Sequence, residues 1–518
     1  MVVRLRKTLF ALVLSVVSVA AACLISTTTR GRPVPLTGPI VVSSPVKAHL
    51  RDGSVVVFRD GVSVMGGTVV GVGWRYNATL SDSQRATPLA VDSVLGLETF
   101  ERTVNAGRTL VYAPATGLAS TLLIAILAAA IFGSCPTIYA DSAGVPVLQA
   151  ESFSYSIAPL LEKRDVDRLS VVADSAGIVR LEVRNEALET HYIDHLELVE
   201  VLHDVDELVL PAGRGGPLAV RALVMPTSVT DRAGRDVRRV VSAVDDAAFA
   251  SDDALLARAA AGGPTEDYID VTLPRPHGRD SVALVLRMRS SLLSTALFYD
   301  QMLARPGARS LDWVGRDLKH ITSVAQLANW YVRHFGLRVS VLEDGRYRQV
   351  ARLVDFGPAA WRNVAAVIPI RDSDSVRIRL SFLADEWRID RLAVASELRR
   401  PQQRLVPLAR VTDGNGLSRL DAHDVLLRAD DRRLQTSPGQ RFFAHFDVGR
   451  TPPPSRRTFL LAAQGYYVEW VRGSWVKAST DSVAFRPSDE ALRRVLRGWR
   501  ASKDSLERHF FSRRVPII

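Results

Sequence analysis

Hydrophobic residues follow different patterns along this chain of 518 residues. Two long stretches, Thr8 to Thr29 and Thr109 to Ala140, contain no Asp, Glu, Lys or Arg. Elsewhere apolar residues mostly alternate with polar ones in short runs broken by Gly, Pro and Asp, which is typical of half-buried strands. Helical spacing appears at residues 291–336 and near the C-terminus. The pattern predicts a mainly β protein with helical insertions and two segments that can enter a membrane.

The first hydrophobic stretch is preceded by Arg4, Arg6 and Lys7, and its apolar run from Leu9 to Ala22 ends in three alanines before Cys23. This order predicts a signal peptide at residues 1–22. It resembles the lipobox of bacterial lipoproteins, in which the cysteine thiol is acylated, although Ala20 stands where those proteins have Leu, Ile or Val. The resemblance implies lipidation at Cys23, followed by a linker to residue 44. Secretion without lipid and an uncleaved anchor helix are the alternatives.

Residues 45–108 contain short β runs separated by Arg-Asp-Gly and Gly-Gly turns. Such a meander of hairpins predicts an SH3-like or Sm-like small β-barrel. Some Sm-like barrels bind RNA, but aromatic and basic residues are not paired in this segment. We therefore expect it to have a structural role.

The second hydrophobic stretch predicts a transmembrane segment within residues 109–135, because it reaches about 20 residues. A helix buried between domains is the alternative. Arg102 and Arg108 precede it, whereas Asp141 and Glu151 follow it. The positive-inside rule then places its N-terminal side in the cytoplasm, which conflicts with an exported N-terminus. A segment that enters the membrane without crossing it would reconcile the two signals.

After this stretch, the phrase "GSCPTIYADSAGVPVLQAESFSYSIAPLLEKRD", from Gly133 to Asp165, resembles a Cys-Pro-x-[Ile/Val]-Tyr opening of uncharacterised bacterial lipoproteins and membrane proteins. "LEVRNEALETHYIDHLELVEV", from Leu181 to Val201, resembles the Asn-Glu strand that follows it in them. The resemblance extends loosely over residues 45–470. It implies a β-rich envelope protein and brings no activity, ligand or catalytic residue.

The remainder divides by composition into several parts. We expect a β-rich domain at 136–290, a helical connector at 291–336, a β-sandwich at 337–397 and a further β-rich segment at 398–485. The third part resembles galactose-binding-like jelly rolls in its Asp-Gly hairpin and its W-x-I-D-x-L strand. Residues 486–518 predict an amphipathic basic helix and tail. Its apolar face either docks on the core or lies on an anionic membrane.

Candidate metal ligands occur at two places. His191, His195 and His203 form the only histidine cluster. Two histidines four apart share a zinc ion only on a helix, since on a strand they are about 13 Å apart. The β-branched residues beyond Tyr192 favour a strand.

The second candidate resembles a calcium-binding loop and comprises Asp413, Asn415, Asp421 and Asp424. Its fifth and sixth positions are Leu417 and Ser418, where such loops need a ligand and a glycine. A polar turn is therefore the favoured interpretation.

Four aromatic residues, Tyr466, Tyr467, Trp470 and Trp475, have the flat apolar faces that stack on sugar rings. They are equally suited to a strand core, which we favour. No nucleophile-elbow, P-loop, zinc-protease or dinucleotide-binding motif occurs. The sequence therefore predicts no catalytic residue and no cofactor, and an enzyme is the less favoured class.

The formal net charge of +11 suits anionic partners, but Asp and Glu are interspersed with the arginines. This distribution argues against nucleic acid and favours the lipid bilayer and an envelope glycan or protein. We expect a membrane-associated protein of the bacterial cell envelope that acts as a non-catalytic binding or structural module. A metal-dependent hydrolase using the histidine cluster and a membrane-surface scaffold are the alternatives.

Overall fold

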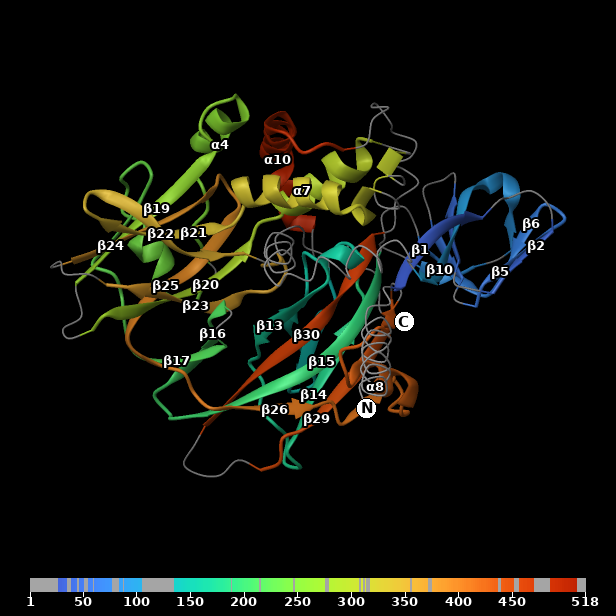
Figure 1. The fold of residues 1–518 in the computed structure, drawn as a ribbon, viewed down its shortest axis with the longest axis horizontal. Coiled ribbons are helices and arrows are strands. Elements are labelled where there is room, and N and C mark those ends of the chain that lie inside the picture. Colours follow the sequence, from blue (N-terminus) through green and yellow to red (C-terminus); the bar gives the residue numbers. More distant parts are fainter. Residues whose placement is uncertain are drawn as a thin grey trace, which may run out of the picture. The chain divides into compact units, whose positions relative to one another are not determined.

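In the computed structural model, the chain forms two compact units, which are described separately (Figure 1). The structure describes residues 27–34, 39–43, 46–50, 55–58, 60–76, 83–86, 88–104, 135–187, 189–213, 216–245, 247–274, 279–306, 309–310, 313, 317–354, 356–370, 375–436, 439–450, 456–469 and 485–509.

The first unit consists of two antiparallel sheets around one apolar core, to which Val46, Phe58 and Val64 belong. Gly66 and Gly67, both with positive φ, make the tight hairpin turn that their sequence predicts. The β-rich first domain is confirmed, whereas an SH3-like or Sm-like barrel stays a prediction. The six-stranded sheet has the order β1 (Thr27–Val34), β10 (Val94–Val104), β3 (Val46–Leu50), β4 (Val55–Phe58), β7 (Gly73–Tyr76) and β8 (Ser83–Arg85), and the four-stranded sheet has the order β2 (Ile40–Val42), β5 (Val62–Met65), β6 (Thr68–Val70) and β9 (Leu89–Ala90).

The predicted linker at residues 23–44 is partly wrong. Its residues 27–34 form β1, which pairs with β10 from Thr27↔Val104 to Val34↔Leu97. Backbone hydrogen bonding satisfies a strand whatever its composition, so a polar segment can pair with an existing edge. The signal peptide, Cys23 and residues 109–134 of the hydrophobic segment lie outside the described residues.

The second unit contains two β-sandwiches. In the first, the two sheets bury residues such as Leu181, Leu198, Phe446 and Leu461 between them. One sheet has the order β12 (Val145–Glu151), β11 (Thr137–Ser142), β14 (Ile178–Arg184), β29 (Arg441–Asp447) and β27 (Arg410–Thr412), and the other has β13 (Lys163–Arg168), β30 (Arg456–Glu469), β15 (Glu189–His203) and β26 (Gln403–Pro407), with β28 (Leu434–Thr436) pairing β15.

The second sandwich is also built from two five-stranded antiparallel sheets, with Leu284, Val339, Leu380 and Ile389 in its core. One sheet has the order β16 (Leu208–Pro211), β17 (Pro217–Val224), β25 (Trp387–Arg399), β20 (Ser281–Ser290) and β23 (Arg362–Pro369), and the other has β18 (Ser228–Asp231), β19 (Glu266–Pro274), β24 (Ser375–Leu383), β21 (Leu337–Glu343) and β22 (Arg346–Leu353).

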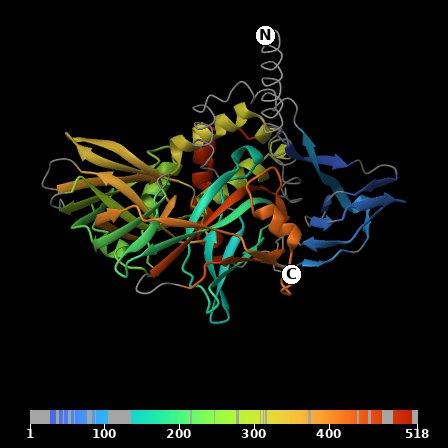
Figure 2. The ribbon, with the colours of Figure 1, turned by 60° about the horizontal axis from the view of Figure 1, so that its bottom comes forward.

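The second sandwich is an insertion in the first, because the chain leaves the first after β15 and returns with β26. Val199 and Leu460 of the first sandwich pack against Val209 and Ala219 of the second. The four sheets therefore follow one another as layers, which Figure 2 shows from a second direction.

Strand pairing crosses the boundaries that composition predicts at residues 290, 336 and 397. β20, before residue 290, lies between β25 and β23, and β15 pairs with β30. Alternation tells which face of a strand is buried but not which strand is its partner, so the insertion was not predictable from it. The β-sandwich at 337–397 is confirmed only as part of a larger sandwich, and its likeness to a jelly roll stays a prediction.

Helices cover one end of the second sandwich (Figure 1). The helix α7 ends before Gly336, whose φ is 91°, as predicted. Among the described ranges, no helix has the length and apolar character needed to cross a bilayer. The helical elements are η1 (Val91–Ser93), η2 (Pro159–Leu161), η4 (Arg238–Val241), α4 (Asp253–Ala260), α5 (Leu293–Ala296), the π-helical η5 (Leu297–Ala304), η6 (Asp317–Lys319), α7 (Ile321–His334), α8 (Leu420–Leu426) and α10 (Asp489–His509).

The predicted amphipathic C-terminal helix is α10, and its apolar face docks on the core. Leu492, Val495, Leu496 and Trp499 are each at most 1% exposed. The helix packs against α4, α5 and η5. These neighbours cover the apolar stripe from Leu492 to Trp499.

Candidate functional site

The predicted histidine cluster lies on strand β15, as the favoured interpretation expected. His191 Nε2 lies 2.7 Å from Glu189 Oε1, and both side chains are completely buried. Burial lowers the pKa of His191 to about 3, so the ring stays neutral. A neutral buried imidazole beside a glutamate fits a structural role.

The fold does not bring His195 and His203 next to His191. His191 pairs with Tyr467 across the sheet, His195 with Gln464 and His203 with Arg456. Both ring nitrogens of His203 have partners, with Nε2 2.9 Å from Thr458 Oγ1 and Nδ1 2.8 Å from the Asp204 carbonyl oxygen. In the part of the chain that the structure describes, no group of three His, Cys, Asp or Glu side chains could hold a metal ion.

The predicted calcium-like run forms a polar turn and the start of a helix. Asp413 Oδ1 accepts the N–H groups of Asn415 and Leu417, both at 2.9 Å. Asp421 lies on α8 and pairs with Arg419 at 2.8 Å, and Asp424 follows on the same helix. The carboxylates serve their own turn and helix rather than converging.

The predicted aromatic group divides between the core and the part of the chain outside the described ranges. Tyr466 and Tyr467 are buried, and Tyr466 stacks on Tyr192 at 4.7 Å between ring centroids. These two are core residues, as favoured. Trp470 and Trp475 lie outside the described residues.

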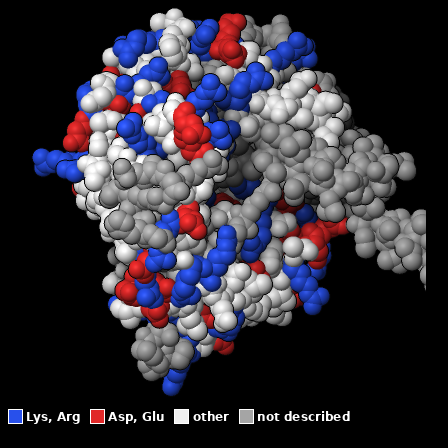
Figure 3. Space-filling model, turned by 60° about the vertical axis from the view of Figure 1, so that its left-hand side comes forward, with Lys and Arg blue, Asp and Glu red and all other residues white. Residues whose placement is uncertain are grey.

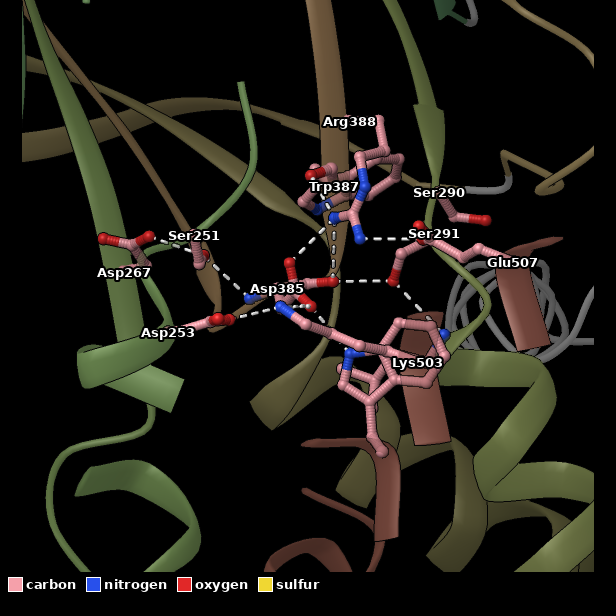
Figure 4. A network of polar contacts seen from close by, with 12 residues as sticks. Ser251, Asp253, Asp267, Ser290, Ser291, Asp385, Trp387, Arg388, Lys503 and Glu507 are labelled. Carbon is pink, nitrogen blue, oxygen red and sulfur yellow. Dashed lines mark hydrogen bonds and ion pairs between the residues drawn. The ribbon is translucent and has the colours of Figure 1, made fainter. Parts of the chain in front are cut away.

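A network of buried charges surrounds Asp385, in the turn between β24 and β25 (Figure 4). Asp385 is completely buried and has a left-handed backbone, with φ 63°. Its Oδ1 accepts from Arg388 Nη1 at 2.8 Å, and its Oδ2 accepts from Trp499 Nε1 at 2.7 Å. Lys503 Nζ lies 3.6 Å from Oδ2 and also pairs with Asp253. Two of these donors come from α10.

The other polar groups of this network also have hydrogen-bond partners. Ser251 Oγ donates to Asp267 Oδ2 at 2.5 Å and accepts the Asp385 N–H at 2.8 Å. Ser291 Oγ donates to the Asp385 carbonyl oxygen at 2.6 Å. Because each Asp385 oxygen already accepts a charged or indole donor, we interpret the network as the attachment of α10 rather than a ligand site.

A second group of buried charges joins the two sandwiches. Arg362 on β23 contacts Asp165 Oδ2 and Asp167 Oδ1 of β13, both at 2.5 Å. Burial raises the pKa of Asp167 to about 7, although Arg362 opposes the shift. Glu151 adds an acceptor at this interface, since its Oε2 receives the Ala359 N–H at 2.7 Å. These groups are also paired, and we interpret them as structural.

A recess of about 420 Å³ opens at the mouth of the first sandwich, between its two sheets. It combines apolar walls with three arginines and one aspartate. The residues come from the β13–β14 connection, the end of β29 and the start of β30, and they are Val172, Ala173, Asp174, Gly449, Arg450, Arg456, Arg457 and Phe459.

One arginine of the recess stabilises its wall. Arg457 Nε lies 2.9 Å from Glu200 Oε1, and its Nη1 donates to the Gly449 carbonyl oxygen at 2.8 Å. Its Nη2 donates to the Arg450 carbonyl oxygen at 2.5 Å. Both charged side chains are over 90% buried, at 8% and 4% exposed. Arg457 therefore fixes the backbone that carries Arg450.

Arg450 and Arg456 differ from Arg457 because both are exposed and neither makes an ion pair with the described residues. The one acidic lining residue, Asp174, uses Oδ1 to accept the N–H groups of Ala176 and Ile178, at 2.9 and 2.8 Å. Within the described ranges no hydrogen bond or ion pair occupies either guanidinium group, so the recess offers both to a ligand. Planar forks of this kind suit carboxylate and phosphate groups.

Sequence reasoning missed this recess. Its lining comes from three segments that are brought together by the pairing of β13 with β30 and of β14 with β29. Arg450 and Arg456 resemble many other arginines of the chain in their local sequence. Over the face drawn in Figure 3, acidic residues lie among the basic ones, as predicted, so charge alone does not mark the site.

Neither a protein-family model nor a curated protein matches this chain. Among solved structures, it is similar to a GH31 alpha-xylosidase from Xanthomonas citri, at 10% identity and TM-score 0.16, over 84% of this chain and 38% of that one. It is also similar to the secreted serine protease VesC from Vibrio cholerae, at 7% identity and TM-score 0.13, over 68% of this chain and 63% of that one. The chain thus spans less than two thirds of either protein, and likenesses this weak carry no argument about fold or function.

Proposed function

We propose that the protein is a non-catalytic binding protein of the bacterial envelope, which holds an acidic glycan at the recess of its first sandwich. The observation that carries the proposal is the pair of free guanidinium groups, Arg450 and Arg456, at a concave site. Exposed ion pairs contribute about 0.2–1 kcal/mol each, so the two arginines favour carboxylates over neutral groups while the rest of the recess adds to the binding.

The rigidity of the recess supports the same proposal. Arg457 holds the carbonyl groups of Gly449 and Arg450, and Gly177 packs directly against the Gly449 backbone. A β-carbon at Gly177 would lie 2.6 Å from that backbone. A wall fixed in this way loses little conformational entropy when a ligand binds.

The apolar part of the lining favours a sugar over a simple anion. Val172 is 91% exposed, and Ala173 lies beside it. Sugar rings have apolar faces that such side chains can cover, while carboxylates of the same ring contact the arginines. An acidic glycan satisfies both halves of the site.

Titration calorimetry tests the proposal with a short oligogalacturonide, which carries one carboxylate per ring, and with an uncharged oligosaccharide of the same length. We expect the acidic ligand to bind and the neutral one to bind at least about tenfold more weakly. The double variant Arg450→Ala/Arg456→Ala should lose the heat that belongs to this site. Added salt should weaken binding, because the charges are exposed.

The control is Arg346→Ala/Arg428→Ala, which removes two other exposed arginines that make no ion pair with the described residues. It changes the net charge equally and should bind like the wild type. If both double variants lose affinity equally, attraction is due to net charge, and the recess is not the site. Equal affinity for the neutral oligosaccharide would also contradict the proposal.

The envelope location is a separate part of the proposal and depends on the signal-like order of residues 1–22 before Cys23. Metabolic labelling with palmitate should mark the wild type but not Cys23→Ser. Protease protection of the C-terminal region then reports on which side of the membrane it lies. An unlabelled wild type would overturn lipidation without affecting the recess.

A further inference from the structure

The second sandwich exposes one face of the sheet β18-β19-β24-β21-β22. The alternate residues Ile269, Val271, Ile378, Leu380 and Val339 point into the core. Their neighbours therefore point outward, since side chains alternate across a strand. We name the outward group of Tyr268, Asp270, Arg377, Arg379, Ser340 and Tyr347 the tyrosine–arginine face.

Arg379 is the centre of this face. Its Nε and Nη2 donate to Asp270 Oδ1 and Oδ2, both at 2.7 Å, which is a bidentate pair. Its Cζ lies 3.8 Å from the ring centroid of Tyr268 and 4.2 Å from that of Tyr347. The guanidinium therefore contacts both rings at the close range of cation–π interactions.

Tyr347 reaches this position across another strand. It belongs to β22, whereas Arg379 belongs to β24, and β21 lies between them. The β21 residue opposite Arg379 is Ser340, which is small enough for the ring to pass over it. The Tyr347 hydroxyl then donates to Asp270 Oδ1 at 3.3 Å. Both ends of the tyrosine are thus fixed on the face.

Of the two rings, Tyr347 offers the platform for a flat apolar ligand, because Tyr268 is contacted by two guanidinium groups, with Arg232 Cζ 5.6 Å from its ring centroid in addition to Arg379. Tyr268 and Tyr347 are both partly exposed. Aromatic rings contribute large contact areas, and these two are already ordered, so stacking costs little additional entropy. A pyranose ring offers the matching apolar surface.

The charges of the face select which sugar would bind. Arg379 is neutralised by Asp270, and Arg338 is neutralised by Glu266 at 2.7 Å. Arg377 lies two residues from Arg379 on the same face, is exposed, and makes no ion pair with the described residues. A free cation beside an aromatic platform is complementary to a sugar ring that carries a carboxylate.

We propose that the tyrosine–arginine face is a second saccharide site, which binds an acidic sugar through ring stacking on Tyr347 and a carboxylate contact to Arg377. The choice of ligand class rests on the proposed function of the recess, but the site itself depends on different residues. With one site on each sandwich, the protein is a bivalent binder. Two linked contacts raise the avidity for a long glycan above the affinity of either site.

Calorimetric stoichiometry of the full-length protein with the short oligogalacturonide tests this. We expect two molecules bound by the wild type and one by Tyr347→Ala/Arg377→Ala. Arg450→Ala/Arg456→Ala should also bind one molecule, and the variant that combines all four substitutions should bind none. Tyr347→Phe keeps the ring and should still bind two, which separates loss of the platform from loss of the Asp270 hydrogen bond. Circular dichroism checks that each variant is folded.

The possible outcomes distinguish the two proposals. A wild-type stoichiometry of one that is unaffected by Tyr347→Ala/Arg377→Ala overturns the second site and leaves the recess. A stoichiometry of one that is lost only in this variant supports the second site and overturns the recess. Absence of binding overturns both. Binding of phosphatidylglycerol vesicles through Arg377, without any saccharide binding, would also overturn the second site.

Discussion

Gly357 packs directly against the carboxylate of Glu151. A β-carbon added at position 357 would lie only 2.2 Å from Oε2 of Glu151. Gly357 belongs to the inserted part of the chain and Glu151 to the first sandwich. The same carboxylate oxygen accepts the N–H of Ala359 at 2.7 Å. The interface between the sandwiches therefore requires the absence of a side chain at position 357.

Gly357→Ala should lower the free energy of unfolding by about 1–3 kcal/mol, the usual cost of overpacking a well-filled site. Urea denaturation of the full-length protein measures it. Gly498→Ala is the matched control, since Gly498 lies in α10 and an added β-carbon there would meet nothing within 4 Å beyond its own stretch of helix. That variant should gain about 0.5–1 kcal/mol from helix propensity. Equal stability of Gly357→Ala and the wild type would show that Glu151 can move aside.

The buried carboxyl group of Glu386 should make the stability of the protein depend on pH. Burial raises the pKa of its carboxyl to about 7, although the N–H groups of Gly336 and Leu383 oppose the shift. The folded protein thus keeps this proton up to about pH 7, whereas the unfolded chain loses it near the ordinary value of 4.5. The stabilisation is complete below pH 4.5 and is lost as the pH rises through 7. The loss is about 3 kcal/mol, since each pKa unit corresponds to about 1.4 kcal/mol.

Glu386→Gln removes this titration while keeping the shape of the side chain. The difference in unfolding free energy between the wild type and the variant should therefore change between pH 4.5 and 7.5 in the stated direction. Asp167 titrates in both proteins, so its contribution cancels in the difference. A difference that stays constant over this range would mean that Glu386 is ionised in the folded state throughout.

The indole of Trp499 anchors α10 through its hydrogen bond to Asp385 Oδ2. Trp499→Phe should cost about 1–3 kcal/mol beyond the loss of ring volume, because it leaves a buried carboxylate short of a donor. Trp330→Phe is the control. Trp330 is also buried, but its Nε1 has no hydrogen-bond partner among the described residues. If the two variants lose equal stability, the hydrogen bond contributes nothing. Limited proteolysis after residue 488 should detect earlier release of α10 in Trp499→Phe.

Strand and helix positions were largely predictable because they depend on local periodicity. The Asp344-Gly345 hairpin, α7 ending before Gly336, and the buried stripe of α10 all agree with the sequence. The insertion of one sandwich into the other was not predictable. β15 and β30 are adjacent in the sheet yet separated by the whole second sandwich, and nothing in their own sequences names the partner.

The candidate sites likewise divide into features set by local sequence and features set by tertiary contacts. His191 was correctly expected on a strand, since β-branched residues surround it. That Arg450 has no ion pair with the described residues was not predictable, because this depends on which carboxylates the fold brings near. Arg457, seven residues later, forms an ion pair with Glu200 from another strand. Whether an arginine is paired within the fold or left open to a ligand is thus decided by tertiary contacts.

Cys135 offers a chemical probe of the interface at Gly357. Its thiol is 4% exposed, and burial together with Glu151 raises its pKa well above the ordinary value. Only the thiolate reacts with disulfide reagents, so the native thiol should react more slowly than the same thiol in urea. Cys23→Ser makes Cys135 the sole thiol. Adding Gly357→Ala to that variant should speed the native reaction, because it displaces the neighbouring Glu151. Adding Gly498→Ala should not, and equal acceleration by both would mean that the reagent reports global unfolding instead of the interface.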